Sequence, residues 1–441
     1  MTPELVKVLD CATSPILSNS ADIIAALEQA RLCVSRSMSP SPLRRSAWLS
    51  ELLQAEVWLK LECLNPIGSF KVRGALNAIA ARSARRASLH LNSSNFKVCA
   101  ASAGNHAQGV AFAAQQMGCE AHIFLPKRSP LVKRDATERL GAKIYLVGDV
   151  LEEAFEAALK FAKEHDAEFL HAFNDFDVIT GQGTCALEII DEYTRVSKKP
   201  LSELTDFICG IGGGGLAAGA GLAFEHFNPN TLVTGVEQEF FDSALQSVKN
   251  KIRTEIDPRG KTSIADGISV RSIGNLTLDI LMRTVPRIVT VTDDDIVGAV
   301  LGLCEREHVV SEGAGAVAVA HLLRNKSYYK GRNIVACVSG GNIDPQLLSR
   351  VIARGLGVTG RMLRITARIG DRPGQLKNLL ELIANLDANV LEVHHDRTYA
   401  QVNVGDVEVE LALETRSIEH QYDLLAKLEE HGFRPKAQGK T

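Results

Sequence analysis

Short apolar runs alternate with longer amphipathic stretches along most of the chain. Between Asn95 and Leu170, and again between Asp206 and Ile343, each apolar run is followed by a stretch with helical spacing. Such alternation is typical of parallel sheets covered by helices on both faces. We therefore expect an α/β protein with two open parallel-sheet lobes and a ligand in the cleft between them. In the first series, the expected strands are 96–101, 120–125 and 143–147, and the expected helices are 105–117, 131–140 and 152–163.

The flanking parts of the chain have other patterns. Residues 56–62 (EVWLKLE) alternate as a half-buried strand does. Residues 362–436 predict a strand, a helix, two strands and a second helix, which is the order of a small ferredoxin-like α+β domain. We expect a first domain, a linker and a second domain, with a small lobe of about residues 65–175 inserted in the larger lobe of the first. The three parts are 1–350, 351–361 and 362–441.

Composition and charge narrow the class of function. Hydrophobic residues make up 45% and charged residues 23% of 441 positions, and the formal net charge is −3, which argues against a nucleic-acid or membrane-binding surface. No run of about 18 apolar residues predicts a membrane span. Nine cysteines occur without a Cys-x-x-Cys pair, so neither a metal site nor a disulfide framework is expected. The N-terminus lacks an apolar signal-peptide core, so we expect a cytoplasmic protein.

The residues around Lys71 favour a chemically reactive amine. Lys71 follows a Gly-Ser turn and precedes an apolar helical stretch in LNPIGSFKVRGAL, residues 64–76. A helix N-terminus acts through its dipole and partial burial through desolvation, and both lower the pKa of a lysine. An uncharged amine is what Schiff-base formation requires. The alternative is a solvated surface lysine, as most lysines near a helix start are.

A second segment, ASAGNHAQGV at 101–110, lies on the turn between an expected strand and an expected helix. Its small residues let backbone N–H groups point at an anion such as a carboxylate, and Asn105 and His106 add side-chain donors. An ordinary turn with an asparagine cap is the alternative.

Two glycine-rich turns complete the pattern. In CGIGGGGLAAG (209–219), four consecutive glycines form a nest of N–H groups that fits a phosphate. A dinucleotide site is the alternative, because Glu237 has the spacing of the acidic residue in such sites. In VSGGNID (338–344), Ser339 ends a strand, and an ordinary turn is again the alternative.

Together, LNPIGSFKVRGA, SAGNHAQG, GIGGGGLAAG and SGGNID resemble the motifs of the fold type II, or tryptophan synthase β-like, pyridoxal-phosphate enzymes. Within this family they are most similar to the threonine/serine dehydratases. HAFNDFDVITGQGTCALEI, ADGISV and SEGAGA match in the same order, so the resemblance covers about residues 20–350. The tail, with IGDRPGQLKNLLELIANLDANVLEVHHDR, is similar to an ACT domain, a module that binds amino acids at dimer interfaces.

The resemblance implies a role for each matching residue. Lys71 would carry pyridoxal 5'-phosphate as a Schiff base and remove the α-proton of the substrate. The residues that would bind the cofactor are Phe70, Lys71, Asn105, Gly212, Gly213, Gly214, Gly215, Leu216, Glu312 and Ser339. Those that would bind the substrate are Ser102, Ala103, Gly104, Asn105 and His106. Those that would bind an effector are Asp371, Arg372, Pro373, Gly374 and Gln375, although an Asp-initiated turn explains that loop equally well.

The implied reaction converts L-threonine to 2-oxobutanoate and ammonia, and L-serine to pyruvate. The implied partners are a small amino-acid substrate, an amino-acid effector and further copies of the chain in a homodimer or homotetramer. Racemases of the family carry a serine where this chain has Ala103, which implies little racemisation. Asn65-Pro66 resembles threonine synthase instead. Another lyase or β-replacement enzyme, such as a 3-hydroxyaspartate dehydratase, threonine synthase or serine racemase, therefore stays open, as does a non-catalytic amino-acid sensor.

Overall fold

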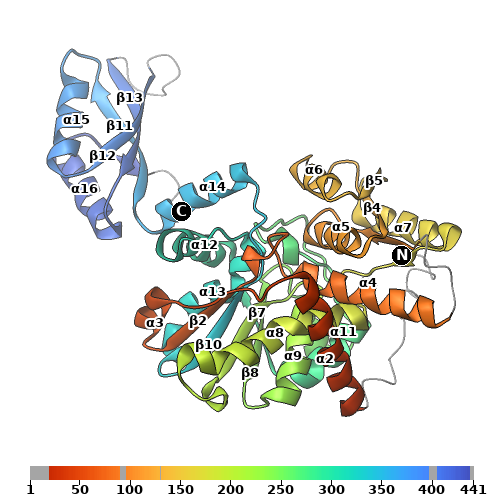
Figure 1. Ribbon diagram of the computed structural model, residues 1–441. Coiled ribbons are helices and arrows are strands. Elements are labelled where there is room, and N and C mark those ends of the chain that lie inside the picture. The colour runs from red at the N-terminus through yellow and green to blue at the C-terminus, as the bar shows by residue number, and fades with distance from the viewer. Residues whose placement is uncertain (1–18, 90–95, 130, 397–404, 438–441) are drawn as a thin grey trace. The chain divides into compact units, whose positions relative to one another are not determined.

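The chain folds into two compact units. The computed structural model describes residues 19–89, 96–129, 131–396 and 405–437. Its contacts divide the chain into Met1–Asp344 and Pro345–Thr441, each with its own sheets (Figure 1). The division falls earlier than residue 350, because helix α14 (Pro345–Val358) belongs to the second unit and occupies most of the predicted linker 351–361.

The larger sheet of the first unit has six strands in the order β1-β2-β10-β7-β8-β9. Its neighbours run parallel except β1 and β2, which are antiparallel. Helices cover both faces, so the central strands are buried apart from Asn333 at the start of β10, and their sequences are apolar runs such as IVACV in β10. The strands are β1 Leu43–Arg45, β2 Glu56–Leu61, β7 Asp206–Gly210, β8 Leu232–Gln238, β9 Arg287–Val291 and β10 Asn333–Val338.

The smaller sheet has four parallel strands in the order β5-β4-β3-β6. Three of them confirm the strands predicted from the first series of apolar runs, and the fourth is a two-residue strand beside β3. They are β3 Lys97–Ala101, β4 Glu120–Leu125, β5 Lys143–Leu146 and β6 Glu168–Phe169.

Helices pack around both sheets of the first unit, and α8 belongs to both lobes. Val178, near the start of α8, packs in the core of the smaller lobe, whereas Leu187 and Ile189 pack in the core of the larger lobe. The helices are α2 Ser20–Ser37, α3 Ala47–Leu53, α4 Lys71–Ser88, α5 Asn105–Met117, α6 Leu131–Arg139, α7 Leu151–His165, α8 Phe176–Ser197, α9 Gly215–Phe227, α10 Ser243–Asn250, α11 Asn275–Thr284, α12 Asp293–Glu307 and α13 Gly313–Arg324.

The second unit confirms the predicted α+β order. Its antiparallel sheet has the order β12-β13-β11-β14, and its helices pack on one face through a core that includes Ile365, Leu379, Leu411 and Leu424. The elements after α14 are β11 Met362–Gly370, α15 Gln375–Asn385, β12 Asn389–Asp396, β13 Asp406–Glu414, α16 Ile418–Glu430 and β14 Lys436–Ala437. Within the described ranges, no helix of either unit is long and apolar enough to cross a membrane.

Candidate active site

Four helices of the first unit begin around one cavity of about 320 Å³, between the carboxyl ends of the two sheets. They are α4, α5, α9 and α13, which start at Lys71, Asn105, Gly215 and Gly313. At none of these four helices does the side chain of the N-cap residue itself accept a hydrogen bond from the first turn. Free N–H groups at a helix start favour negative charge, so the cavity is suited to an anionic ligand.

Lys71 is the first residue of α4, and its side chain lines the cavity. Its Nζ donates a hydrogen bond to the carbonyl oxygen of Ala172 at 3.0 Å and lies 5.1 Å from the centre of the Phe70 ring. Burial lowers the pKa of Lys71 to about 8, against the opposing effect of the Glu312 carboxylate. The structure therefore agrees with the partly uncharged amine predicted from the sequence, and not with a solvated surface lysine.

The loop before Lys71 is attached to the end of β10. Gly68 has φ +69°, and a Cβ atom there would lie 2.4 Å from Oδ1 of Asn342, so only glycine fits. The Phe70 N–H donates to the Ser339 carbonyl oxygen at 3.1 Å, and the Gly341 N–H donates to the Gly68 carbonyl oxygen at 2.9 Å. Lys71 and Ser339 are thereby brought to the same cavity.

The glycine turn after β7 forms a tight cradle at the start of α9. Gly214 has φ +93°, and a Cβ atom on Gly213 would lie 2.1 Å from the ring of Phe173. Glu237, the acidic residue of the dinucleotide alternative, lies elsewhere. Its buried carboxylate accepts hydrogen bonds from the N–H groups of Ala244 and Leu245, both at 2.8 Å, where it caps α10. The geometry thus favours a phosphate over a dinucleotide ribose.

A chain of three polar side chains fixes Asn105. Its Nδ2 donates to Oε1 of Glu312 at 2.7 Å, and its Oδ1 accepts from Nδ2 of Asn342 at 2.8 Å. Burial and the nearby Asp266 raise the pKa of Glu312 to about 7, although the hydrogen bond from Asn105 lowers it. Asn105 therefore presents its amide in one orientation, beside a carboxyl group that titrates near neutral pH.

His106 differs from the expectation that its side chain donates a hydrogen bond to a bound anion, because its donor is already used by a backbone carbonyl group. Its Nε2 donates to the Leu170 carbonyl oxygen at 3.0 Å, and its buried Nδ1 has no hydrogen-bond partner among the described residues. Burial and the positive charge of Lys71 lower the pKa of His106 to about 3. The ring is therefore neutral with an acceptor at Nδ1, which leaves the backbone N–H groups at the start of α5 as donors to a carboxylate.

Every residue predicted to bind cofactor or substrate lines this one cavity. Sequence reasoning missed several others, among them Phe173, Lys133 and Asp266. Lys133, on α6 of the smaller lobe, pairs with Asp266 in the short helix η4 (Asp266–Ile268) of the larger lobe, at 2.6 Å between Nζ and Oδ2. Phe173 and Asp266 lie in matching motifs, whereas no sequence signal indicated Lys133.

Four of the five predicted effector residues lie in the loop between β11 and α15 of the second unit, where Gly374 has φ +92°, and Gln375 is the first residue of α15. A cavity of about 340 Å³ in this unit is lined by residues including Arg368, Asn378 and His431. Of the five predicted effector residues, the structure brings only Gln375 to that cavity. No group of three or more His, Cys, Asp or Glu side chains could hold a metal ion in the parts of the chain that the structure describes.

The cavity fits pyridoxal phosphate. It offers a lysine for the aldehyde, a glycine cradle at an uncapped helix start for the phosphate, and the hydroxyl of Ser339 for the ring nitrogen. Residues 34–340 match the model of the family described as pyridoxal-phosphate dependent enzyme. The chain belongs to this family.

Several proteins that are similar to this chain have names more specific than that of the family. L-threonine ammonia-lyase of Thermotoga maritima is 40% identical over 415 residues, which cover 94% of this chain and 98% of that protein. L-threonine ammonia-lyase of Geobacter sulfurreducens is 37% identical over 392 residues, or 89% of this chain and 93% of that protein. A solved structure of threonine deaminase isoform 2 from Solanum lycopersicum is 31% identical, with a TM-score of 0.68 over 77% of this chain and 90% of that chain.

Proposed function

We propose that this protein is a threonine ammonia-lyase that converts L-threonine to 2-oxobutanoate and ammonia, and L-serine to pyruvate. The observation that carries the proposal is the 40% identity to a threonine ammonia-lyase across 94% of the chain. The cavity supports it, because Lys71, the glycine cradle and Ser339 lie together there.

Bound pyridoxal phosphate supplies an aldehyde for amines and an electron sink for the α-carbon of the substrate. The N–H groups of Gly212 to Gly215 and of Leu216 would hold its phosphate, and Asn105 would donate to its ring hydroxyl. Ser339 would face the ring nitrogen. Beside a neutral hydroxyl, the ring nitrogen would stay largely unprotonated and would withdraw electrons less strongly than a protonated nitrogen paired with a carboxylate. That difference would favour prompt elimination over transamination.

Lys71 moves the proton. With a pKa of about 8, an appreciable fraction of its amine is uncharged at neutral pH and can accept the α-proton. The N–H groups at the start of α5 would hold the substrate carboxylate. Ala103 lines the cavity without an acid–base group, so no side chain at that position returns the proton from the opposite side. We therefore expect elimination with little racemisation.

The chain departs from dehydratase motifs at Asn65, at Asn174, where an acidic residue is common, and at Gly210, where proline is frequent. Of these three, only Gly210 lines the cavity. The side chain of Asn65 is buried, and its Nδ2 donates to Oε2 of Glu62 at 2.6 Å. Asn174 accepts a hydrogen bond from the N–H group of Leu276 at 3.0 Å. Neither residue lines the cavity, so neither favours threonine synthase or another β-replacement enzyme over a dehydratase.

The test is a visible absorbance spectrum of the purified protein with pyridoxal phosphate, repeated after L-threonine is added and coupled to a 2-oxo acid assay. We expect a lysine-bound cofactor band that changes with threonine while 2-oxobutanoate appears. A cofactor band without turnover would contradict the substrate, and 3-hydroxyaspartate would be assayed next. Absence of the band would contradict the site.

We also propose that the protein is a cytoplasmic homodimer or homotetramer whose second unit binds an amino-acid effector near Asp371 to Gln375. The predicted loop and the cavity beside Gln375 support this proposal. An effector can change activity only as far as it binds two states of the protein differently. Truncation after Gly360 should leave cofactor binding intact and abolish any response to amino acids. An unchanged response would contradict the proposal.

A further inference from the structure

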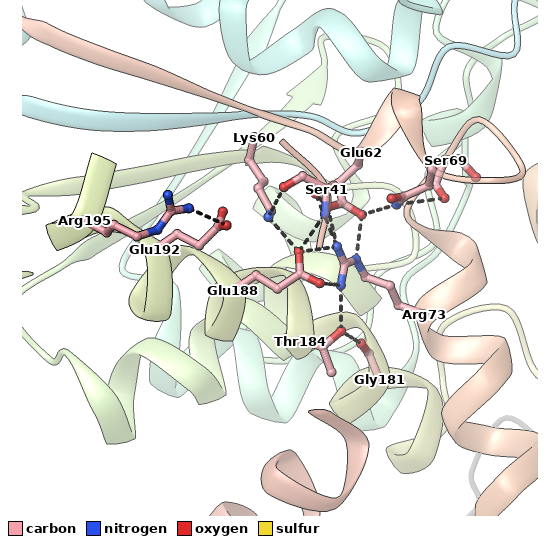
Figure 2. A network of polar contacts seen from close by, with 11 residues as sticks. Ser41, Lys60, Glu62, Ser69, Arg73, Gly181, Thr184, Glu188, Glu192 and Arg195 are labelled. Carbon is pink, nitrogen blue, oxygen red and sulfur yellow. Dashed lines mark hydrogen bonds and ion pairs between the residues drawn. The ribbon is translucent and has the colours of Figure 1, made fainter. Parts of the chain in front are cut away.

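A cluster of charged side chains lies beside the active site without lining it (Figure 2). We call it the Arg73 cluster. Its charged members are Lys60, Glu62, Arg73 and Glu188, and its polar members are Ser41, Asn65 and Thr184. The side chains of Lys60, Glu62 and Arg73 are 0% exposed and that of Glu188 is 13% exposed. The four charges sum to zero.

Arg73 makes two forked contacts inside the cluster. Its Nε and Nη2 donate to the two oxygens of Glu62 at 2.7 and 2.8 Å. Its Nη1 and Nη2 donate to the two oxygens of Glu188 at 2.6 and 2.7 Å, and Nη1 also donates to Oγ1 of Thr184 at 3.1 Å. A planar guanidinium held by two carboxylates has a fixed orientation, which the single ammonium of a lysine cannot reproduce.

The partners of Arg73 come from the other lobe. Arg73 is on α4, whose Val72 and Leu76 pack in the core of the smaller lobe. Glu62 is in the short helix η2 (Glu62–Leu64), which follows β2 of the larger sheet, and Glu188 is in the part of α8 that packs in the larger core. Figure 2 shows Arg73 pointing away from α4 toward both carboxylates. The cluster therefore attaches the first turn of α4 to the larger lobe.

Stability alone does not account for this arrangement. The desolvation cost of buried charges largely cancels their attraction, and apolar side chains of similar volume often stabilise a fold as well or better. What a forked ion pair adds is a defined geometry. The question is then which nearby group needs a defined position.

That group is Lys71. Lys71 and Arg73 are two residues apart in the first turn of α4, and residues with this spacing point to different sides of a helix. Lys71 lines the cavity, whereas Arg73 reaches the cluster. Asn65 adds a second link, since its Nδ2 donates to Glu62 and lies 3.5 Å from the carbonyl oxygen of Ser69 in the loop before Lys71.

We propose that Arg73 is a positioning residue for Lys71. The cluster fixes the rotation and height of the first turn of α4, and this holds the Lys71 amine beside the Ala172 carbonyl oxygen in the cavity. The inference rests on the proposed function, because a precisely held amine matters only if Lys71 carries the cofactor and moves the proton.

The test compares Arg73→Lys with Arg82→Lys. Arg82 is a matched control because it lies on the same helix, binds Asp175 and Asp177 at the start of α8, and does not line the cavity. Both substitutions keep the charge and remove a guanidinium fork. For each holoenzyme we would measure kcat, KM, the affinity for pyridoxal phosphate, the pH midpoint of the bound-cofactor absorbance, and thermal unfolding.

For Arg73→Lys we expect kcat to fall about 10²-fold while KM stays within about threefold, because a reacting group displaced by about 1 Å loses rate without losing substrate binding. We expect the pH midpoint to shift as well, and Arg82→Lys to behave as the unsubstituted enzyme. An unchanged kcat and pH midpoint in Arg73→Lys would overturn the inference. So would a loss of activity explained entirely by a smaller folded fraction.

If Arg73→Lys does not fold, the same measurements on Glu188→Gln test the inference. It keeps the shape of the side chain and one acceptor oxygen, so we expect a smaller change of kcat and pH midpoint in the same direction. No change would overturn the inference, as would failure of this variant to fold. Failure of the proposed function looks different, because the unsubstituted enzyme and Arg82→Lys would then also lack cofactor absorbance or 2-oxo acid formation.

Discussion

Among the described residues, the Arg73 cluster and the Lys133–Asp266 pair both join the two lobes of the first unit through charges, and these two contacts differ in their access to water. In the Arg73 cluster, Arg73 and Glu62 are fully buried, and each of the four charges has an opposite charge in contact. Lys133 and Asp266, which line the cavity, form one pair whose side chains are 24% and 56% exposed, and we call this exposed part of the lining the mouth of the cavity. Both contacts have short distances, so distance alone does not separate them.

Exposure to water determines how much free energy is needed to open each contact. If the Arg73 cluster opened, charges would remain unpaired in a dry interior, which is strongly unfavourable. If the Lys133–Asp266 pair opened, both groups would regain water, and exposed pairs are worth only about 0–1 kcal/mol. Opening the cluster therefore costs more free energy than opening the Lys133–Asp266 pair, and we call the cluster the joint of the lobes.

The largest effect should come from removing the amine that the joint holds. Lys71→Ala should lower kcat by about 10³-fold or more, because it removes the proton acceptor. Lys133→Ala, which removes another lysine of the same cavity lining, should lower kcat far less. Steady-state assays of the two holoenzymes check this, and equal losses would contradict the role of Lys71.

The second effect is on stability at the joint. Arg73→Met leaves Glu62 and Glu188 buried without their main partner and should reduce the free energy of unfolding by about 3–5 kcal/mol. Urea denaturation of the variant beside Arg82→Met measures it. A loss below about 1 kcal/mol would mean that the cluster stabilises the fold no more than an exposed ion pair does.

The joint should also respond to acid. Burial would raise the pKa of Glu62, but Arg73 and Lys60 lower it to about 2, below its ordinary value of 4.5. A carboxyl group with a lowered folded-state pKa contributes stability above its unfolded pKa, and this stability is lost as the pH falls. The free energy of unfolding should therefore decline between about pH 4.5 and pH 2. In Glu62→Gln this part of the decline should be missing, and an identical pH profile would contradict the assignment.

The smallest effect is expected at the mouth. Lys133→Met and Asp266→Asn should each change the free energy of unfolding by less than about 1 kcal/mol, because the pair is exposed. Urea denaturation in low and high salt checks this, since screening should remove even that difference. A loss of several kcal/mol would mean that the pair, and not only the cluster, joins the lobes.

The same comparison shows which parts of the fold and of the site could be predicted from the sequence alone. The alternating lobes, the α+β tail and the cavity lining around Lys71, Asn105, Gly212 to Gly215 and Ser339 were predictable, since each depends on local periodicity or a contiguous motif. The strand predicted at 56–62 is confirmed as β2, but the prediction that it is half-buried was wrong, because β2 is buried on both faces. Lys60 gives that segment its alternation, yet its amine is paired with Glu188, 128 positions away in sequence.

The same limit applies at the mouth of the cavity. Lys133 and Asp266 are 133 positions apart, and nothing in the residues around Lys133 indicates a partner. Contacts between distant charges depend on the completed fold, so periodicity and motifs do not reveal them.

The pairing of β2 with β10 has a consequence for synthesis of the chain. β2 is made early and exposes the apolar residues Val57, Leu59 and Leu61, whereas its neighbour β10 is the last strand of the first unit to be made. All strands of the smaller sheet lie between residues 97 and 169, so this sheet can form before β10 is available to pair with β2. Because exposed apolar strands tend to aggregate, we expect the growing chain to need protection of this segment until β10 has left the ribosome.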